Sequence, residues 1–548
     1  MSWQVMPEFD SYETARREFE WNLPERFNPA VDFLRKGDRA DRSALIYDPP
    51  DGPERTFTFG ELDERSDRLA AALAELGIEA GDRVAVVVPQ KPQNPLTHLA
   101  NWKLGAVSVP LTVLFGRDAI AHRLSDSGAR AVVVDPMAKE TIEAVRGECP
   151  DLEAIIELGD RADGDAHAFE SLVSAQEPGI DAYDSTPETS TAIMYTSGST
   201  GPPKGVLHSH ALWLGRAAAA HNYFEGLRDA TVWTPADWAW GAALGGTLFA
   251  AWHHGQSIVG RPRGGFDPEA AFELMQRHGV TKAFMPPTAL RMLMTVDAPA
   301  ERWDLDLETI GSAGEPLTPE VVEWVDERLP DVSINEFYGQ TELNLVVGNR
   351  SSWFDTRPGS MGRPFPGYEI ELLDPEDRTP VETGELGEIA VKPDDERVFF
   401  DEYWGLPERT AKKRTDDGWF LTGDIASVDS EGYLWFQSRA DDVILTSGYR
   451  VGPMEVEGAL LRHPDIEQAG VIGVPDDVRG EAIKAFVQPT TDEFDPERLR
   501  EELRSLVRER LAEYEYPREI EFVDALPQTS TGKIQRATLR ERERPGDR

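Results

Sequence analysis

Cysteine and lysine are both scarce in this chain of 548 residues. The single cysteine, Cys149, excludes an intrachain disulfide and a cysteine-rich metal site. Lysine accounts for only eleven of the 56 basic residues, so arginine carries most of the positive charge. The chain also has 99 acidic residues, so the difference between acidic and basic residues gives a formal net charge of −43. Because nucleic acids and anionic membranes are bound by basic patches, this balance argues against both as partners.

The acidic residues are spread along the whole chain rather than gathered in a tail. A dispersed acidic surface with little lysine suits molar salt, where screening removes the self-repulsion. An unusually acidic protein from an ordinary cytosol is the alternative. The sequence also lacks an apolar run near the roughly eighteen residues of a spanning helix, and residues 1–50 lack a signal-peptide pattern. We therefore expect a soluble, cytoplasmic protein of a salt-adapted organism, without stable membrane association; no feature indicates an oligomeric state.

Helix-like and strand-like segments alternate over residues 60–150, and the alternation returns between residues 269 and 339. Short apolar runs such as "DRVAVVVP" are typical of buried parallel strands, and "ELDERSDRLAAALAELGI" has helical spacing. This rhythm predicts an α/β fold with two stacked αβ lobes. Residues 155–190 are acidic and without pattern, which favours a surface loop.

The pattern changes to short strands with Gly and Asp turns between about residues 360 and 437, which predicts a β-rich, barrel-like subdomain. Beyond it, helix and strand patterns predict a small α+β domain. We therefore expect a large N-terminal domain over residues 1–440 and a small C-terminal domain over residues 441–548.

The stretch "YTSGSTGPPKGV" at residues 195–206 has the composition of a phosphate-binding loop but not the spacing of a P-loop. "AIMYT" indicates a strand and "SGSTGPPKG" a loop, in which Gly198, Gly201 and Gly205 allow positive φ and close backbone approach. Exposed N–H groups, hydroxyls and the Lys204 ammonium can together wrap a polyphosphate. On spacing alone, an ordinary mobile surface loop remains the alternative.

Further motifs follow in a fixed order: "AGEPL" (313–317), "YGQTE" (338–342), "TGD" (422–424), "SRADDVILTSGYRVGPMEVE" (438–457) and "PQTSTGKIQR" (527–536). Together with the loop, they resemble the signatures of the adenylate-forming superfamily, which includes acyl-CoA synthetases, peptide-synthetase adenylation domains and luciferases. The segments "VPDDVRGEAIKAFV" and "YPREIEFVDALPQTSTGKIQRA" are most similar in sequence to the medium-chain acyl-CoA synthetase branch.

The resemblance implies a reaction in two halves. A carboxylate attacks the α-phosphorus of ATP to give an acyl-adenylate and pyrophosphate, and a thiol, usually that of coenzyme A, then displaces AMP. A carboxylate is already a nucleophile and AMP is a good leaving group, so this chemistry needs positioning and charge compensation rather than a Ser-His-Asp device.

The resemblance also assigns ATP-binding residues. The loop should hold the β- and γ-phosphates, through Thr196, Ser197, Gly198, Ser199, Thr200, Gly201 and Lys204. Two later segments should line the adenine, namely Gly314, Glu315 and Pro316 with Glu336, Phe337, Tyr338, Gly339 and Gln340. Asp424 and Arg439 correspond to the ribose contacts, although an Asp in "GD" is by itself more often a turn residue.

Three residues are implied in catalysis. Thr341 resembles the hydroxyl donor to the α-phosphate, and Glu342 resembles the ligand of Mg²⁺, which proteins often hold by one carboxylate together with phosphate oxygens and waters. Lys533, in a loop after a glycine, should bridge the acyl carboxylate and the α-phosphate as charge develops.

The resemblance places a hinge between the two domains at Asp441. Rotation of the small domain would remove the lysine and deliver the "SGYR" segment to form the thiol tunnel. The implied coenzyme A contacts are Ser447, Gly448, Tyr449 and Arg450, with Arg479 and Arg518 as candidates for its phosphates. Both arginines have the alternative of being ordinary surface residues.

The acyl pocket is implied by "TPADWAWGAALGGTLFAAW" at residues 234–252, with Trp240 as a wall. A Trp on an apolar helix is also compatible with a plain core position. After "YGQTE" the usual Thr-Gly is replaced by Leu343-Asn344, and the branched Leu343 should reshape the tunnel. This departure leaves the chain length of the acid open.

The sequence therefore predicts an ATP-dependent, AMP-forming acyl-CoA synthetase for a short-chain, medium-chain, branched or aromatic carboxylic acid, with ATP, Mg²⁺ and coenzyme A as its cofactors and co-substrates. One alternative is an adenylation enzyme that loads a carrier protein. Another is a non-catalytic acyl- or nucleotide-binding protein, although Lys533, Glu342 and Asp424 are all present.

Overall fold

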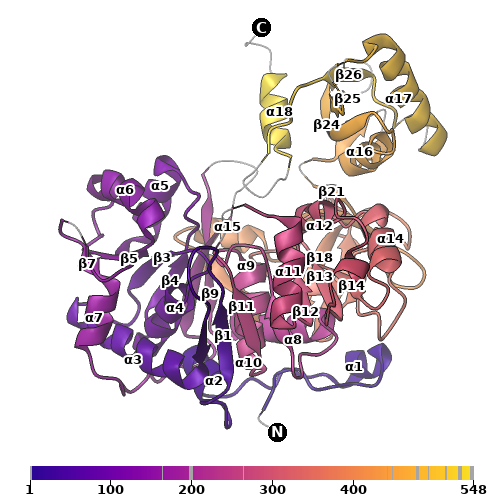
Figure 1. The fold of residues 1–548 in the computed structure, drawn as a ribbon. Helices are drawn as coiled ribbons and strands as arrows, with labels where there is room; N and C mark the ends of the chain where they lie inside the picture. The colour runs from indigo at the N-terminus through magenta and orange to yellow at the C-terminus, as the bar shows by residue number, and fades with distance from the viewer. Residues whose placement is uncertain are drawn as a thin grey trace. The chain divides into compact units, whose positions relative to one another are not determined.

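A computed structural model of the chain describes residues 3–162, 164–196, 202–262, 265–440, 442–446, 449–476, 480–491, 493–511, 515–528 and 534–543. These residues fall into two compact units. The first unit comprises Met1–Glu369 with Lys392–Gly418, and the second comprises Ile370–Val391 with Trp419–Arg548. Helices and strands are mixed in both units (Figure 1), which confirms the predicted α/β class. The predicted domain boundary at residue 440 stays a prediction.

Eight strands of the first unit, among the residues described, form a mostly parallel sheet. In spatial order they are β19 (Phe400–Tyr403), β9 (Lys204–Ser209), β8 (Ser190–Thr196), β4 (Val107–Pro110), β3 (Arg83–Val87), β5 (Ala129–Val134), β6 (Ala154–Glu157) and β7 (His167–Ala168). The helices that alternate with the strands along the chain are α3 (Phe59–Glu75), α4 (Gln93–Leu104), α5 (Arg117–Ser127), α6 (Pro136–Val145) and α7 (Phe169–Ala175). The apolar runs of β3 and β5 are almost wholly buried, as expected for strands covered on both faces.

Helix boundaries in this sheet follow from local sequence. Helix α3 begins with a capping box, in which the Thr58 hydroxyl accepts from the Glu61 N–H and the Glu61 carboxylate accepts from the Thr58 N–H. Helix α4 ends at Gly105, whose φ of 76° is a conformation that favours glycine. These signals locate the helix ends without reference to tertiary packing.

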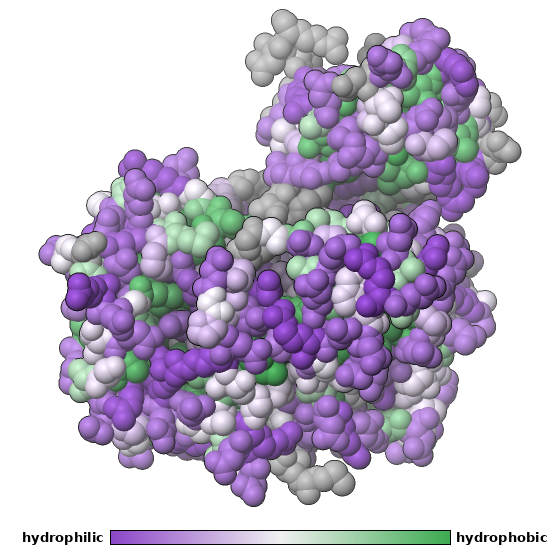
Figure 2. Space-filling model, viewed as in Figure 1, coloured by the Kyte–Doolittle hydropathy of each residue, from purple (hydrophilic) through white to green (hydrophobic). Residues whose placement is uncertain are grey.

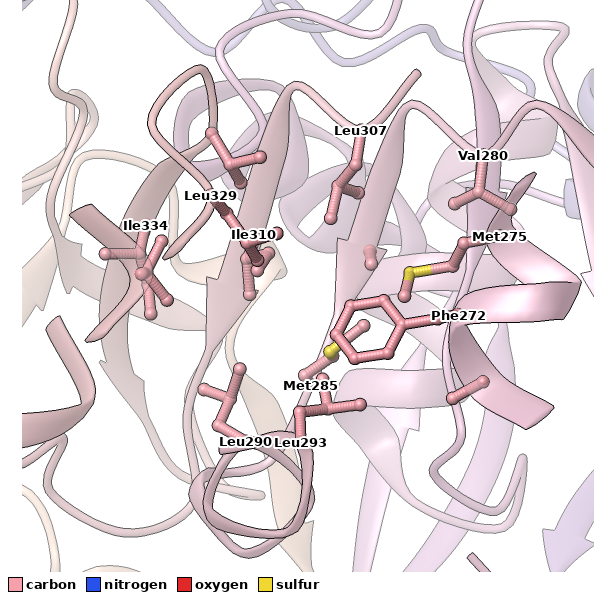
Figure 3. Close-up of a cluster of buried hydrophobic side chains, with 14 of the residues drawn as sticks. Phe272, Met275, Val280, Met285, Leu290, Leu293, Leu307, Ile310, Leu329 and Ile334 are labelled. Atoms are coloured by element: carbon pink, nitrogen blue, oxygen red, sulfur yellow. The ribbon is translucent and has the colours of Figure 1, made fainter. Parts of the chain in front are cut away.

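A second sheet of the first unit contains nine described strands. In spatial order they are β16 (Arg363–Pro364), β15 (Leu345–Gly348), β14 (Ser333–Gly339), β13 (Thr309–Ser312), β12 (Lys282–Phe284), β10 (Thr231–Trp233), β11 (Ser257–Gly260), β1 (Ser43–Tyr47) and β2 (Arg55–Thr58). The helices α11 (Pro268–His278), α12 (Pro287–Leu293) and α14 (Pro319–Arg328) pack against its central strands through a cluster that includes Phe272, Met285 and Ile310 (Figure 3).

Helix α8 (Ala211–Tyr223) lies between the two sheets. It contacts β9 of the eight-stranded sheet and β14 and β15 of the nine-stranded sheet, and every one of its residues is buried. It also packs against the consecutive segments α9 (Gly241–Ala243), the π-helix η2 (Leu244–Phe249) and α10 (Ala250–His253). A helix buried all round is expected to be apolar all round, so the arginine in its centre, Arg216, is an exception that requires a reason.

The remaining elements of the first unit are short. They are the α-helices α1 (Tyr12–Glu18), α2 (Pro29–Arg35), α13 (Pro299–Arg302) and α15 (Pro407–Lys412) and the 3-10 helices η1 (Arg146–Glu148) and η3 (Glu396–Val398). None of the described helices meets the length and hydropathy that a membrane crossing requires.

The second unit contains two smaller sheets. The first has the order β17 (Tyr368–Leu373), β18 (Gly387–Pro393), β20 (Phe420–Val428) and β21 (Leu434–Arg439). The other joins β23 (Tyr449–Val451), β22 (Ile444–Thr446), β25 (Gly480–Pro489) and β24 (Ile466–Asp476), and β26 (Glu519–Phe522) also pairs with β25. The helices are α16 (Pro453–Leu460), α17 (Pro496–Arg510) and α18 (Arg536–Arg542). From Pro453 to Phe522 the chain order is α16, β24, β25, α17 and β26, in agreement with the mixed helix and strand patterns from which the sequence predicts a small α+β domain.

Three local predictions are corrected by the structure. Residues 155–190 are not one loop, because they contain most of β6, all of β7 and helix α7. Lys204 and Gly205 lie in strand β9 rather than in the glycine loop. Gly205 does not have a positive φ; it is needed for space, because a Cβ there would lie 2.7 Å from Ile193 Cγ2.

Candidate active site

The two ends of the predicted phosphate loop are held by a β-hairpin. Strands β8 and β9 pair antiparallel, with Thr196 opposite Lys204 and Tyr195 opposite Gly205. The intervening Ser197, Gly198, Ser199, Thr200 and Gly201 lie outside the described residues. Thr196 and Lys204, both half-buried, therefore sit side by side where the chain enters and leaves the loop.

The side chain of Tyr403 contacts both Lys204 and Glu342. The Lys204 ammonium lies 4.5 Å from the centre of the ring, and the Tyr403 hydroxyl donates a hydrogen bond of 2.7 Å to Glu342 Oε1. Tyr403 itself is almost fully buried, at 1% exposure. The predicted phosphate-binding lysine and the predicted metal-binding carboxylate are thus fixed on one rigid aromatic side chain.

Strand β19 holds Glu342 a second time, through the backbone. The Phe400 N–H donates to the Glu342 carbonyl at 2.9 Å. Because β19 is also the antiparallel neighbour of β9, with Tyr403 opposite Val206, one strand connects the hairpin to the "YGQTE" segment. Thr341 and Glu342 are both half-buried.

The two segments predicted to line adenine lie at the carboxyl ends of neighbouring parallel strands. Strands β13 and β14 pair with Ser312 opposite Glu336, and ligands commonly bind at this edge of a parallel sheet. The turn after β13 contains Gly314, whose φ of 103° favours glycine. Glu336 joins the segments, because its Oε1 accepts from the Leu317 N–H at 3.2 Å. Burial raises the pKa of Glu336 to about 8.

Within these segments, only some side chains face outward. Glu315 pairs with Arg291 at 3.0 Å, and Pro316 is half-buried next to it. Phe337 points into the core, where it stacks on Tyr223 with ring centres 4.0 Å apart.

Alternation along β14 therefore leaves only the backbone of Phe337 for a ligand, whereas Tyr338 and Gln340 are half-buried. The Gln340 amide donates to the Tyr338 hydroxyl at 3.4 Å. Gly339 has no room for a side chain, because a Cβ there would lie 2.3 Å from the Asn344 carbonyl oxygen.

The predicted acyl-pocket residues differ in exposure. Trp240 is half-buried and lies at the N-terminus of α9 rather than within a helix. Its loop is fixed by Asp237, which accepts from the Thr112 hydroxyl at 2.6 Å and from the Ala239 N–H at 3.0 Å. Leu343 is fully buried. Neighbouring Asn344 donates to the Val398 carbonyl at 2.5 Å, so this departure from the usual Thr-Gly is built into the core.

In the second unit, the two predicted ribose contacts form an ion pair with each other. Asp424 on β20 lies opposite Arg439 on β21, and Arg439 Nη1 is 3.0 Å from Asp424 Oδ1. The Asp424 side chain is buried, whereas that of Arg439 is 44% exposed. Arg439 therefore orients the carboxylate and remains accessible itself.

Most of the predicted coenzyme A and catalytic residues of the second unit are not described. Ser447, Gly448, Arg479, the predicted hinge residue Asp441 and Lys533 lie outside the described residues, and for Tyr449 and Arg450 only the backbone position in β23 is described. Arg518 is exposed, stacks on the Tyr516 ring at 4.1 Å and hydrogen-bonds the Tyr516 hydroxyl.

A buried ion-pair cluster lies close in sequence to both the hinge and the lysine loop. Arg536 pairs with Glu457 at 2.6 Å and with Asp442 at 3.5 Å, and Arg540 pairs with Asp442 at 2.7 Å. Asp442 follows the predicted hinge by one residue, and Arg536 follows Lys533 by three. The cluster therefore joins one residue next to the predicted hinge to one that follows the predicted lysine loop.

Two family models match the chain. The model described as AMP-binding enzyme matches residues 35–403, and the model described as AMP-binding enzyme C-terminal domain matches residues 455–533. The chain belongs to the AMP-binding enzyme family.

Curated relatives of this family are similar over nearly their full length. The mitochondrial acyl-coenzyme A synthetase ACSM3 of Mus musculus is 32% identical over 98% of this chain and 94% of its own. The acetyl-coenzyme A synthetase of Bacillus subtilis is 35% identical over 97% and 94%, respectively. A solved structure of the anthranilate CoA ligase AuaEII in complex with anthranoyl-AMP superimposes with a TM-score of 0.85, at 29% identity, over 95% of this chain and 98% of that chain.

These findings confirm the adenylate-forming, acyl-CoA synthetase resemblance that the sequence motifs indicate, and place the chain among AMP-forming CoA ligases. The roles of individual residues within the AMP-binding enzyme fold stay predictions. Sequence reasoning missed Tyr403, Arg536 and Arg216. No motif marks Tyr403, which is one of several aromatic residues in "RVFFDEYW". Arg216 has a visible signal, because it is the single charged residue in the apolar stretch "ALWLGRAAAA".

One other cluster has the composition of a metal site. Ligand atoms of Asp48, Glu54 and His278 lie within 4.8 Å of one another. However, Asp48 also pairs with Arg261 at 2.9 Å and Arg277 at 3.2 Å. The Asp48 charge is therefore already neutralised, and we interpret this cluster as a structural ion-pair network.

Proposed function

We propose that this AMP-binding enzyme activates a carboxylic acid with ATP and transfers the acyl group to coenzyme A. The observation that carries the proposal is the Lys204–Tyr403–Glu342 arrangement at the base of the hairpin. It fixes a cation for phosphate oxygens and a carboxylate for a hard metal ion on one buried ring. Such an arrangement suits a metal-bound polyphosphate, and it sits in a chain whose relatives are acyl-CoA synthetases.

In the first half-reaction, a carboxylate oxygen of the acid forms a bond to the α-phosphorus while the bond from that phosphorus to the pyrophosphate oxygen breaks. Thr196, Lys204 and the intervening loop bind the departing pyrophosphate, and Thr341 donates to the α-phosphate. Glu342 is the residue suited to hold Mg²⁺, an ion that would neutralise charge on the phosphates when bound. Lys533 stabilises the negative charge between the two reactants.

In the second half-reaction, the sulfur of coenzyme A forms a bond to the acyl carbon and the bond from that carbon to AMP breaks. We propose that the segment around Ser447–Arg450 guides the thiol and that Arg479 and Arg518 bind phosphates of coenzyme A. Movement at Asp441 would exchange the lysine loop for this segment. The Asp442–Arg536–Glu457 cluster supports this proposal, because it gives the segments on either side a common anchor.

The acid itself is proposed only by class. The relatives are named for acetate and anthranilate as well as for acyl groups in general, so short, medium-chain, branched and aromatic acids are all candidates. The second candidate function is transfer of the acyl group to a carrier protein instead of coenzyme A. Its only support is that both kinds of enzyme begin with the same adenylation step.

The test is pyrophosphate release with ATP and Mg²⁺ over a panel of linear, branched and aromatic acids, with and without coenzyme A. We expect turnover on one group of acids that depends on coenzyme A and is abolished in Lys533→Ala. Adenylate formation without thioester would favour a carrier protein. Absence of turnover on every acid would contradict the proposal.

We further propose that the protein works in molar salt, in the cytoplasm of a salt-adapted organism. Figure 2 shows hydrophilic residues over most of the visible surface, with hydrophobic residues in scattered patches, and the formal net charge is −43. Because dispersed acidic charge repels itself at low salt, the thermal midpoint should rise as KCl increases from tens of millimolar to molar. A midpoint that is independent of salt would contradict this proposal.

A further inference from the structure

Arg216 is a buried cation without an anionic partner. It lies in the middle of α8 with 3% exposure, and its Nε is buried without a hydrogen-bond partner. No described residue forms a salt bridge or hydrogen bond with its guanidinium. Burial lowers the pKa of Arg216 to about 10, so the group is still charged at neutral pH. An unpaired buried charge carries a desolvation penalty of several kcal/mol. Binding of an anion next to the charge would offset this penalty.

The other titratable groups near Arg216 are neutral. Tyr223 and Tyr368 are close enough to interact electrostatically with it, and burial raises the pKa of both phenols far above neutrality. Burial, together with the Arg216 charge, lowers the pKa of His208 to about 3, so this imidazole is uncharged. The described protein groups therefore supply no counter-charge, and the missing anion must come from a ligand.

The guanidinium lies directly behind the predicted wall of the acyl pocket. Its Nη2 is 3.4 Å from the position that a Cβ at Gly241 would take, and Met194 Sδ is 3.6 Å from the same position. Trp240, Gly241 and Ala242 are all partly exposed, so this wall is accessible.

Two glycines, Gly241 and Gly245, lie between Arg216 and the predicted acyl pocket. Arg216 Cγ lies 3.0 Å from where a Cβ at Gly245 would be. Gly245 belongs to the π-helix η2, a distortion that often marks functional sites. A side chain at Gly245 would crowd the arginine, whereas a Cβ at Gly241 would only touch it.

We infer that Arg216 is the counter-ion of a second anionic group on the acid, so that the preferred substrates carry a further carboxylate besides the one that is activated. This inference rests on the proposed function. The reacting carboxylate loses its charge when it becomes an acyl-adenylate, whereas a second carboxylate keeps its charge through both half-reactions. Of the acid's own groups, only the second carboxylate can neutralise a permanently buried cation throughout the cycle.

The test compares acids of similar shape with and without the second charge, namely succinate with pentanoate and isophthalate with meta-toluate. Wild type should have the higher kcat/KM for the dianion in each pair. Arg216→Met should lower kcat/KM for the dianions by about 30-fold or more and leave the uncharged analogues unchanged or improved. Arg216→Lys, which keeps the charge, should retain part of the preference.

Arg350→Met is the matched control, because Arg350 is also buried but pairs with Glu8 at 3.5 Å; it should leave the preference unchanged. Thermal midpoints of all variants report folding. Should Arg216→Met not fold, calorimetric binding of succinate to wild type and Arg216→Lys in the presence of ATP decides the question. A binding preference for succinate over pentanoate that weakens in Arg216→Lys supports the inference, and equal binding overturns it.

Three other results would also overturn the inference. Equal losses on both acids of a pair would mean that Arg216 acts on the reacting carboxylate or on the fold. Turnover of monocarboxylates alone would show that the proposed function holds without a second charge. A third result is activity that depends on KCl for every acid and is not supported by potassium methanesulfonate. If Arg216→Met loses this dependence, Arg216 binds chloride rather than a substrate carboxylate. No turnover on any acid would instead refute the proposed function, and with it this inference.

Discussion

The hydroxyl of Tyr403 donates to Glu342 Oε1 at 2.7 Å, while the ring of the same tyrosine lies 4.5 Å from the Lys204 ammonium. Groups that orient a metal ligand contribute to metal affinity although they do not touch the metal. Tyr403 is therefore a positioning residue for Glu342, the carboxylate that we propose to bind the metal.

Tyr403→Phe should weaken the apparent affinity for Mg²⁺ by about 10-fold. The substitution keeps the ring under Lys204 and removes only the hydrogen bond to Glu342. A titration of pyrophosphate release with Mg²⁺ measures the effect, and excess Mg²⁺ should restore most of the activity. Tyr12→Phe is the control, because it also removes a tyrosine hydroxyl, which donates to the Pro364 carbonyl at 3.0 Å. This variant should not shift the Mg²⁺ titration. A purely structural role of Tyr403 would lower activity at every Mg²⁺ concentration alike.

Glu336 should make the stability of the first unit depend on pH. Its folded pKa of about 8 lies above the ordinary value of 4.5, so the folded state binds more protons between these values. Stability therefore falls as pH rises from 4.5 toward about 8. Glu336→Gln should remove this slope and be more stable than wild type above that pH, by roughly 2 kcal/mol.

Thermal midpoints measured at acidic, neutral and alkaline pH test the Glu336 prediction. Glu323→Gln on α14, an exposed carboxylate of the same unit, is the control and should leave the wild-type slope in place. A Glu336→Gln variant that is less stable than wild type at alkaline pH would show that the carboxylate is ionised in the folded protein.

Asp424→Asn should raise the KM for ATP by about 10-fold or more, because a charged hydrogen-bond acceptor for the ribose is removed and Arg439 loses its partner. Initial rates over a range of ATP concentrations measure the change. Asp429→Asn, directly after the end of β20, is the control and should keep the wild-type KM. An unchanged KM in Asp424→Asn would remove Asp424 from the nucleotide site.

Gly205→Ala should destabilise the first unit by about 1–3 kcal/mol. The added Cβ would lie 2.7 Å from Ile193 Cγ2 and 3.2 Å from Trp404 Cβ, so the hairpin below the phosphate loop would have to shift. Gly147→Ala, where a Cβ meets no atom within 4 Å and the residue lies inside the 3-10 helix η1 (Arg146–Glu148), should leave stability unchanged or raise it by up to about 1 kcal/mol. Similar thermal midpoints for the two variants would contradict this packing argument.

The sequence predicts the fold well where local pattern decides the structure. Apolar runs such as that of β3 and the capping signals of α3 identify elements that do not depend on distant contacts. The prediction of a loop over residues 155–190 is wrong, because α7 has seven residues and too few apolar positions for a clear period. A strand as short as β7 likewise leaves no periodic signal.

The candidate site is predictable only in part. Motifs name Lys204, Glu342 and Asp424, because their chemistry needs those residue types at those positions. They do not name Tyr403, which lies 61 residues beyond Glu342 and meets it only through strand pairing. Nor does a motif show that Phe337 faces the core or that Arg216 lacks a partner, since both depend on how α8 packs between the sheets.

The central claim is that the acid is activated as an acyl-adenylate. The most direct measurement uses an acid whose carboxylate is labelled with oxygen-18, with ATP, Mg²⁺ and coenzyme A, followed by mass spectrometry of the nucleotide and phosphate products. The account predicts one labelled oxygen in AMP for each thioester formed, with unlabelled pyrophosphate. Label in inorganic phosphate together with ADP, or thioester formed without label in AMP, would contradict it.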